Sequence, residues 1–207
     1  MLTIDKEKTA LLVMDVQNDI IHKDGKYKDF GTPAHAEERD IFANIRKVLD
    51  KARETGMKVV HVKFGMRDFD EETKNNHTPI LSAVKELRAC DLNSWGGDIH
   101  EAFDIHEAFT PVEGEDIVEK NRVNSFQNTN LKQILDDAGI ETLVMTGVAT
   151  NYVVEATARH ASDDEYRVII VDDCCSSMNQ ELHDFSMNNI LPNLGQICTS
   201  DDIVAVL

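Results

Sequence analysis

Residues 9–15 read Thr9-Ala-Leu-Leu-Val-Met-Asp15, an almost continuous apolar run that ends in a carboxylate. Such a run is typical of a central parallel strand that is buried on both faces of its sheet. Asp15 then lies at the carboxyl end of that strand, where ligands bind in sheets of this kind. This one stretch therefore predicts a fold class and a candidate site residue together.

Apolar runs of strand length alternate with stretches of helical spacing along the rest of the chain. Strands are expected over 57–64, 116–120, 142–147, 167–172 and 195–198, and helices over 36–55, 131–138, 150–162 and 180–190. Alternation of this kind implies right-handed crossovers and parallel pairing. We therefore predict an α/β fold, a three-layer Rossmann-like sandwich whose mostly parallel sheet of about six strands carries helices on both faces.

The length of the chain indicates a single domain over 1–207, because 207 residues with 42% hydrophobic content can bury one sizeable core. Residues 65–110 are irregular and polar, with a short helical stretch at 81–88 and a Trp95-Gly96-Gly97 turn. Long segments between core elements are usually functional. We predict that this insertion shapes a pocket.

The acidic balance of the chain excludes several classes of partner. The chain has 21 basic and 38 acidic side chains and a formal net charge of -17, so its field repels phosphate backbones and anionic membranes. Residues Met1 to Lys8 lack a basic segment followed by an apolar one, and no apolar run approaches the roughly 20 residues that span a bilayer. We expect a cytoplasmic protein that binds neither nucleic acid nor membranes.

Four segments carry a family resemblance through their order and spacing. They are LLVMDVQND at 11–19, DIVEKNRVNSF at 116–126, LVMTGVATNYVVEATARHA at 143–161 and VIIVDDCCSS at 168–177. From about Thr9 to the C-terminus, the chain resembles the isochorismatase-like superfamily of cysteine hydrolases. That superfamily includes nicotinamidases, N-carbamoyl-amide hydrolases, ureidoacrylate and biuret hydrolases, and isochorismatase itself.

The resemblance implies a catalytic role for three positions. Matched residue by residue, Asp15 is the general base, Lys120 stabilises developing charge, and the nucleophilic cysteine falls on Val153. A helix N-terminus and a nearby cation would lower the pKa of a thiol at that place. Valine has neither a lone pair nor an acidic proton, so covalent attack from position 153 is excluded.

The resemblance also implies a cis peptide bond between Val148 and Ala149. The backbone amides of Ala149 and Val153 would then form an oxyanion hole. Backbone donors do not depend on the missing sulfur, so this part of the site is expected to survive.

Five residues are predicted to bind substrate. Tyr152 matches a residue type of the nicotinamidase-like members and follows Asn151, and the stretch around Trp95 resembles the Trp-Gly turn of ureidoacrylate and biuret hydrolases. Arg67 and Phe126 are the other candidates. The alternative for each aromatic residue is ordinary packing in the core or in a satellite of it.

No metal or other cofactor is predicted. Nicotinamidases place an aspartate and histidines after the second strand, but here that stretch reads HVKFGMRDF from His61, without the two-histidine spacing that a metal needs. His77, His100 and His106 are scattered in the insertion.

The four cysteines have no disulfide or zinc spacing and are expected to be reduced, mostly buried thiols. They are Cys90, Cys174, Cys175 and Cys198. Burial makes Cys174 and Cys175 poor substitutes for the missing nucleophile.

Two functions fit these observations. One is a hydrolase that acts on a small amide, urea-like or vinyl-ether substrate without a cysteine, since Asp15 is retained. The other is a catalytically inactive pseudoenzyme that binds a small molecule or an assembly partner. A third explanation for Val153 is a replacement that was introduced to trap a substrate. By analogy with the family, we expect a homo-oligomer, either a dimer or a tetramer.

Overall fold

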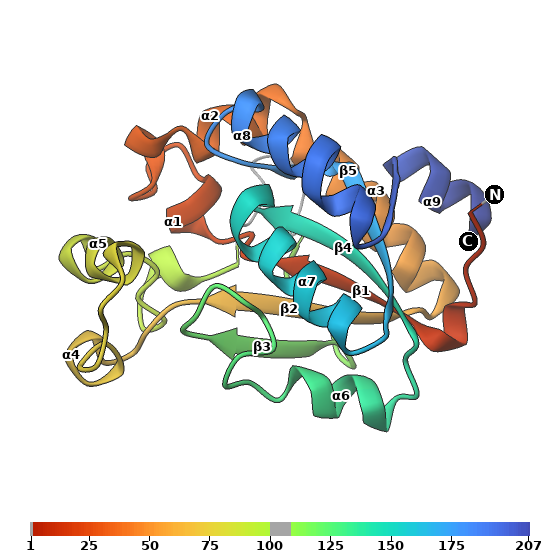
Figure 1. Cartoon of the computed structure of the whole chain (residues 1–207), viewed down its shortest axis with the longest axis horizontal. Coiled ribbons are helices and arrows are strands. Elements are labelled where there is room, and N and C mark those ends of the chain that lie inside the picture. The colour runs from red at the N-terminus through yellow and green to blue at the C-terminus, as the bar shows by residue number, and fades with distance from the viewer. Residues whose placement is uncertain (1, 100–108) are drawn as a thin grey trace.

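The fold is organised around one six-stranded parallel sheet, as the computed structural model shows for residues 2–99 and 109–207 (Figure 1). The strand order is β3-β2-β1-β4-β5-β6, and every neighbouring pair is parallel. The strands are β1 (Thr9–Met14), β2 (Lys58–Phe64), β3 (Asp116–Lys120), β4 (Thr142–Val148), β5 (Arg167–Ser176) and β6 (Gln196–Cys198). The predicted α/β class and parallel sheet are confirmed.

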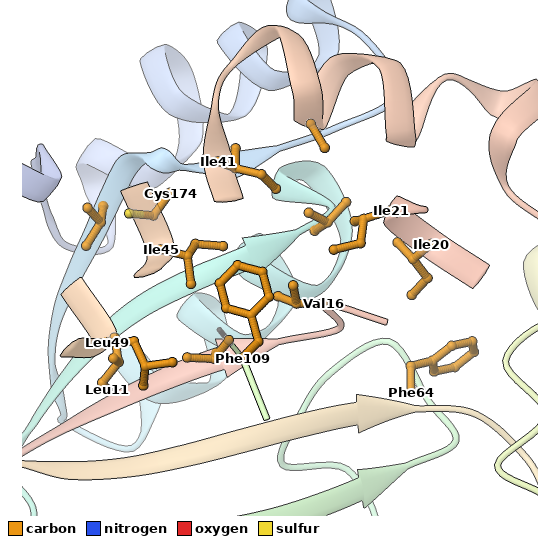
Figure 2. Packing of buried hydrophobic residues seen from close by; sticks show 14 of the residues in the cluster. Leu11, Val16, Ile20, Ile21, Ile41, Ile45, Leu49, Phe64, Phe109 and Cys174 are labelled. Carbon is orange, nitrogen blue, oxygen red and sulfur yellow. The ribbon is translucent and has the colours of Figure 1, made fainter. Parts of the chain in front are cut away.

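The apolar run at 9–14 is buried throughout because β1 has a helical layer on each face. Leu11 and Val13 belong to the cluster that includes Ile45 of α3 (Ile41–Thr55), which Figure 2 shows from close by. Leu12 and its even-numbered neighbours belong to the opposite cluster, which includes Leu131 of α6 (Leu131–Asp137) and residues of α7 (Glu155–Asp163). Alternating side chains of one strand thus fill two cores.

The remaining helices are short and border these layers. They are α1 (Asn18–Ile21), α2 (Thr32–Glu38), α4 (Phe69–Glu72), α5 (Pro79–Leu87), α8 (Gln180–Phe185) and α9 (Ser200–Val206). Single turns of 3-10 or π helix complete the chain: η1 (Lys6–Lys8), η2 (Lys28–Phe30), η3 (Trp95–Gly97), η4 (Thr150–Val154), η5 (Ser186–Ile190) and η6 (Leu191–Asn193). Among the described residues, no helix has the length and apolar character needed to cross a bilayer.

Several boundaries differ from the sequence-based prediction, and two of the differences have a clear physical reason. The helix expected over 36–55 is two helices, because Asp40 adopts a left-handed conformation with φ 51° between α2 and α3. The fifth strand extends to Ser176 rather than to Asp172, because its last residues still pair with Gly147 and Val148 of β4.

The insertion over 65–110 forms α4, α5 and η3 within its described part. Figure 1 shows α4 and α5 beyond the carboxyl ends of β2 and β3. Gly96 in η3 lies against the Asp19 carboxylate, where an added Cβ would stand 2.2 Å from Oδ2. Asp19 Oδ2 also accepts the Cys90 N–H at 2.7 Å, so one buried carboxylate joins the insertion to α1.

Candidate active site

The candidate site lies where the order of the strands reverses. β1 and β4 are neighbours in the sheet. The next strand after β1 is β2, which lies toward one edge of the sheet, whereas the next strand after β4 is β5, which lies toward the other edge. Open parallel sheets bind ligands beyond the carboxyl ends of two such strands. Gly147 permits the close approach, because its φ is 136° and an added Cβ would lie 2.1 Å from the Met14 carbonyl oxygen.

Asp15 and Lys120 form a buried ion pair at this edge. Lys120 Nζ donates to Asp15 Oδ2 at 2.7 Å and to the Arg122 carbonyl at 3.2 Å. It also lies 4.8 Å from the centroid of the Phe64 ring. Asp15 Oδ1 has no hydrogen-bond partner among the described residues, so one carboxylate oxygen is left for a ligand.

Burial controls the protonation of this pair. Burial raises the pKa of Asp15 from 3.8 to about 6, although the charge and hydrogen bond of Lys120 act in the opposite direction. Burial also lowers the pKa of Lys120, against the effect of Asp15. A carboxyl group with a pKa near 6 can both take and give a proton close to neutral pH.

The turn after β4 brings the predicted nucleophile position to the same place. The Val148–Ala149 peptide bond is cis, and η4 begins at the next residue. Val153, in η4, is 1% exposed. Ala149 and Val153 both border the cavity that contains Asp15 and Lys120. Their roles as oxyanion donors remain predictions.

These residues surround a cavity of about 340 Å³. The ionisable pair Asp15 and Lys120 stands at one part of its wall, and most of the remaining wall is apolar. The other lining residues are Ile20, Tyr27, Phe30, Thr32, Phe64, Pro79, Ile80, Ala83, Val84, Leu87, Val123, Val148, Ala149, Tyr152, Val153 and Met178. α5, which belongs to the insertion over 65–110, forms part of this wall, and a role of the insertion in shaping the substrate pocket stays a prediction.

No cysteine lines this cavity among the described residues, which include all four thiols of the chain. Cys90 is the thiol whose pKa responds to both Asp15 and Lys120, but burial raises its pKa well above 9.0. Burial likewise raises the pKa of Cys174 and Cys175, and that of Cys198 to about 12. These thiols therefore stay protonated near neutral pH and are poor nucleophiles.

Of the five predicted substrate-binding residues, Tyr152 lines the cavity and the other four lie elsewhere. Arg67 donates to Glu119 Oε1 at 2.7 Å on the surface. Trp95 is 51% exposed and packs edge-on against the His22 ring. Arg67 and Trp95 therefore do not line the cavity described here, and their part in substrate binding stays a prediction.

Phe126 and Asn151 also lie outside the cavity wall, and their part in substrate binding stays a prediction. Phe126 stacks on His160 with ring centroids 4.5 Å apart, within the cluster on the α6 and α7 face. Asn151 Oδ1 accepts a hydrogen bond from the Ser177 hydroxyl instead of facing the cavity. Both follow site residues closely in sequence, but their side chains point into other packing environments.

Two parts of the wall contain residues that the sequence did not single out individually. Residues 20–32 contribute Ile20, Tyr27, Phe30 and Thr32, and α5 contributes its apolar face. That face has a visible signal, since Ile80, Ala83, Val84 and Leu87 follow the i, i+3, i+4, i+7 spacing of an amphipathic helix. Tyr27 lines the cavity together with Asp15, and burial is the main cause that raises the pKa of its hydroxyl.

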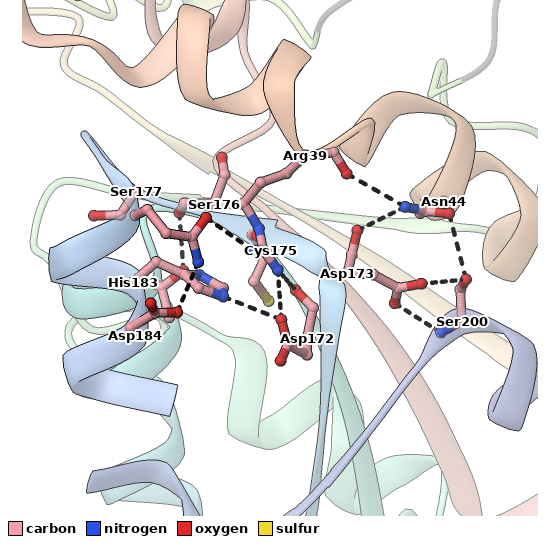
Figure 3. Close-up of polar contacts among 12 residues, drawn as sticks. Arg39, Asn44, Asp172, Asp173, Cys175, Ser176, Ser177, His183, Asp184 and Ser200 are labelled. Carbon is pink, nitrogen blue, oxygen red and sulfur yellow. Dashed lines mark hydrogen bonds and ion pairs between the residues drawn. The ribbon is translucent and has the colours of Figure 1, made fainter. Parts of the chain in front are cut away.

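A polar network supports the turn that carries Val153, and Figure 3 shows much of it. Thr150 Oγ1 donates to the Ser176 carbonyl at 3.0 Å and lies 2.8 Å from His183 Nδ1. His183 Nε2 lies 3.1 Å from Asp172 Oδ1, and Arg39 forms an ion pair with the same carboxylate. Hydrogen bonding to His183, and then the charge of Arg39, lower the pKa of Asp172.

The histidines of the chain do not gather around a metal in the part that the structure describes. No group of three potential His, Cys, Asp or Glu ligands occurs there. His61 binds Glu115 with 2.9 Å between Nε2 and Oε2, and His77 is exposed. His100 and His106 lie outside the described residues.

This chain is similar in sequence to known proteins over most of its length. The isochorismatase domain model matches residues 9–202. Ureidoacrylate amidohydrolase RutB of Rhizobium rhizogenes is 28% identical over 216 residues, covering all of this chain and 86% of that protein. RutB of Acinetobacter baylyi is 30% identical, covering 96% of this chain and 83% of that protein.

A solved structure gives the same view of the fold. The crystal structure of a cysteine hydrolase from Pseudomonas syringae pv. phaseolicola 1448A superposes with a TM-score of 0.84 at 21% identity, covering all of this chain and 95% of the other. The matched residues 9–202 include all six strands of the sheet. This protein therefore belongs to the isochorismatase family of hydrolases.

Proposed function

We propose that this protein hydrolyses a small amide or urea-like substrate without an enzyme thiol, with Asp15 as the proton-transfer group. The observation that carries the proposal is the free oxygen of Asp15. Oδ1 is buried and unpartnered among the described residues, in a cavity that Val153 also lines. The names of the RutB relatives support an amidohydrolase reaction.

Water would take the place of the missing thiol. Its oxygen attacks the carbonyl carbon while Asp15 accepts the proton that is released. The carbonyl oxygen gains a negative charge, which the amides of Ala149 and Val153 would stabilise. The bond from carbon to the leaving nitrogen then breaks, and Asp15 returns its proton to that nitrogen.

Lys120 would hold Asp15 in place and keep it ionised. Its ammonium group is 2.7 Å from Oδ2, which leaves Oδ1 to receive the proton. A cation at this distance also favours the negative charge that develops on the substrate.

A hydrolysis screen tests the proposal. Nicotinamide, N-carbamoyl amides, ureidoacrylate, biuret and isochorismate are offered to the unchanged chain, to Asp15→Asn and to Val153→Cys. We expect the unchanged chain to turn over at least one compound and Asp15→Asn to lose roughly 100-fold or more in rate. Equal rates for the unchanged chain and Asp15→Asn would reject the role of Asp15.

A second function is favoured by Val153 itself. Its buried isopropyl group cannot attack a carbonyl, which suits a pseudoenzyme that binds a small molecule without turnover. In that case, the unchanged chain binds a compound of the screen but does not hydrolyse it, and only Val153→Cys is active.

Vinyl-ether cleavage differs from both because Asp15 would then act as an acid. The protonated carboxyl would donate its proton to the terminal vinyl carbon, and water would add to the carbon that bears the ether oxygen and return a proton to Asp15. The resulting hemiketal would then break its bond to the ether oxygen, which leaves as an alcohol while a carbonyl compound forms. The direction of the pH dependence separates this reaction from amide hydrolysis.

A further inference from the structure

We infer that the cavity selects a neutral ligand with an apolar alkyl or aryl body and disfavours ligands that carry a carboxylate. The inference rests on the proposed function, because it assumes that the cavity beside Asp15 is the substrate site. It adds the substrate class to the reaction type.

The charges in the cavity wall cancel each other. Lys120 is the only Lys or Arg that lines the cavity in the described part of the chain, and Asp15 is the only Asp or Glu there. Their side chains are 2.7 Å apart and both are buried. A carboxylate on the ligand would compete with Asp15 for Lys120 and leave one anion without a partner, which is unfavourable away from water.

Nearby arginines are held by other groups. Arg67 binds Glu119, and Arg39 binds Asp172 and the Cys175 carbonyl. Arg122 Nη1 donates to the Asn121 carbonyl at 2.7 Å. None of these three lines the cavity. The described wall therefore offers no second cation to a ligand carboxylate.

The rest of the wall suits an apolar ligand. The apolar face of α5 presents Ile80, Val84 and Leu87 to the cavity. Phe30, Leu87 and Tyr152 are among the large hydrophobic residues that remain exposed, and all three line the cavity. Exposed apolar side chains that gather at one cavity indicate a binding site for apolar surface.

The compound in the names of the RutB relatives differs in charge from the ligand inferred here. Ureidoacrylate, the compound in the RutB names, carries a carboxylate, whereas the wall described here is neutral overall. We therefore expect this chain to bind a different substrate class from the one that the RutB names state, although it belongs to the same family.

Calorimetric titration with a matched pair of compounds tests the inference. The neutral 4-methylbenzamide and the anionic 4-carbamoylbenzoate share one amide and one ring and differ in a methyl group against a carboxylate. We expect the neutral compound to bind at least about tenfold more tightly to the unchanged chain. Equal or tighter binding of the carboxylate, or no binding of either compound, would overturn the inference.

Leu87→Arg then supplies the missing cation at a residue that is 39% exposed and can carry a charge without unfolding the chain. This variant should bind 4-carbamoylbenzoate at least about tenfold more tightly than the unchanged chain does. Val206→Arg is the matched control, because Val206 in α9 is 36% exposed and does not line the cavity.

Unchanged selectivity in Leu87→Arg, or the same gain in Val206→Arg, would contradict the inference. The readout is a ratio of dissociation constants. A failure of the proposed hydrolysis leaves that ratio intact. A reversed ratio together with Asp15-dependent turnover contradicts the substrate class alone.

Discussion

Asp15 and Lys120 show two opposing electrostatic effects in one pair of residues. The attraction between the charges lowers the pKa of Asp15, whereas burial raises it, and the net result of about 6 shows that burial is the stronger effect. Such a pair adds little to stability, since desolvation offsets much of the attraction. A role of the free carboxylate oxygen in acting on a ligand accounts for the desolvation cost of keeping this pair buried.

The pH dependence of turnover follows from this pKa. If Asp15 accepts a proton from water, the active form is ionised, so kcat/KM should rise with pH through about 6 and then level off. Initial rates with the best amide of the screen at a series of pH values measure the profile. A profile that falls through about 6 would show that the protonated form is active, as for vinyl-ether cleavage.

The connection between β4 and α7 is the element that brings the site residues together. η4 begins directly after the cis peptide bond, and its first residue is anchored from outside the helix. The hydroxyl of Thr150 binds the last residue of β5 and lies beside His183 of α8. The position of the Val153 backbone therefore depends on elements that are distant in sequence.

Thr150→Val tests this dependence. The change removes a buried hydroxyl that meets both Ser176 and His183, so we expect a loss of about 1–3 kcal/mol in the free energy of unfolding. Ligand affinity at the cavity should fall as well, because the turn loses its anchor. Chemical denaturation and calorimetric titration measure the two effects.

Thr157→Val is the control for that variant. Its hydroxyl is also buried and donates to Ser125 Oγ at 2.9 Å, but it lies on α7 and does not line the cavity. We expect a similar loss of stability with unchanged affinity. Equal affinity losses in both variants would show that the network around Thr150 has no special effect on the site.

At the scale of the whole molecule, the Glu115 carboxylate links α3 to β2 and β3 near the amino-terminal ends of the strands. Glu115 directly precedes β3 and accepts from Arg53 of α3 at 2.7 Å, while His61 of β2 lies 2.9 Å away. Burial alone would raise the pKa of Glu115, but hydrogen bonds from Arg53, the Val112 amide and His61 lower it to about 2. This link holds the fold together at the end opposite the cavity.

Glu115→Gln should lower the free energy of unfolding by about 1–3 kcal/mol near neutral pH. Because the folded pKa is depressed, this stabilisation is complete above the ordinary value of 4.5 and is lost as the pH falls toward about 2. Urea denaturation of both proteins near neutral pH and at about pH 3 should therefore show a smaller difference under acidic conditions.

Glu141→Gln is the comparison, because Glu141 pairs with Lys8 at 2.7 Å on the exposed surface. Exposed pairs of this kind contribute little, so this variant should match the unchanged chain. A difference for Glu115→Gln that stays constant between the two pH values would contradict the proposed linkage.

The sequence by itself determined the α/β class, the parallel strands and the edge that carries Asp15, Lys120 and the turn to Val153. These properties follow from local apolar runs and from the rule that parallel strands end at one edge. The helix boundary at Asp40 was not predictable in this way, since a single left-handed residue interrupts an otherwise helical pattern.

Only the tertiary structure decided which side chains meet. The side chains of Arg67, Trp95, Phe126 and Asn151 have their partners outside the cavity wall, because side-chain direction depends on packing. The α5 wall, the network around Thr150 and the raised pKa of Asp15 arise in the same way. Burial and charge pairing come from residues far apart in the chain, so they exist only once the sheet and its helices have assembled.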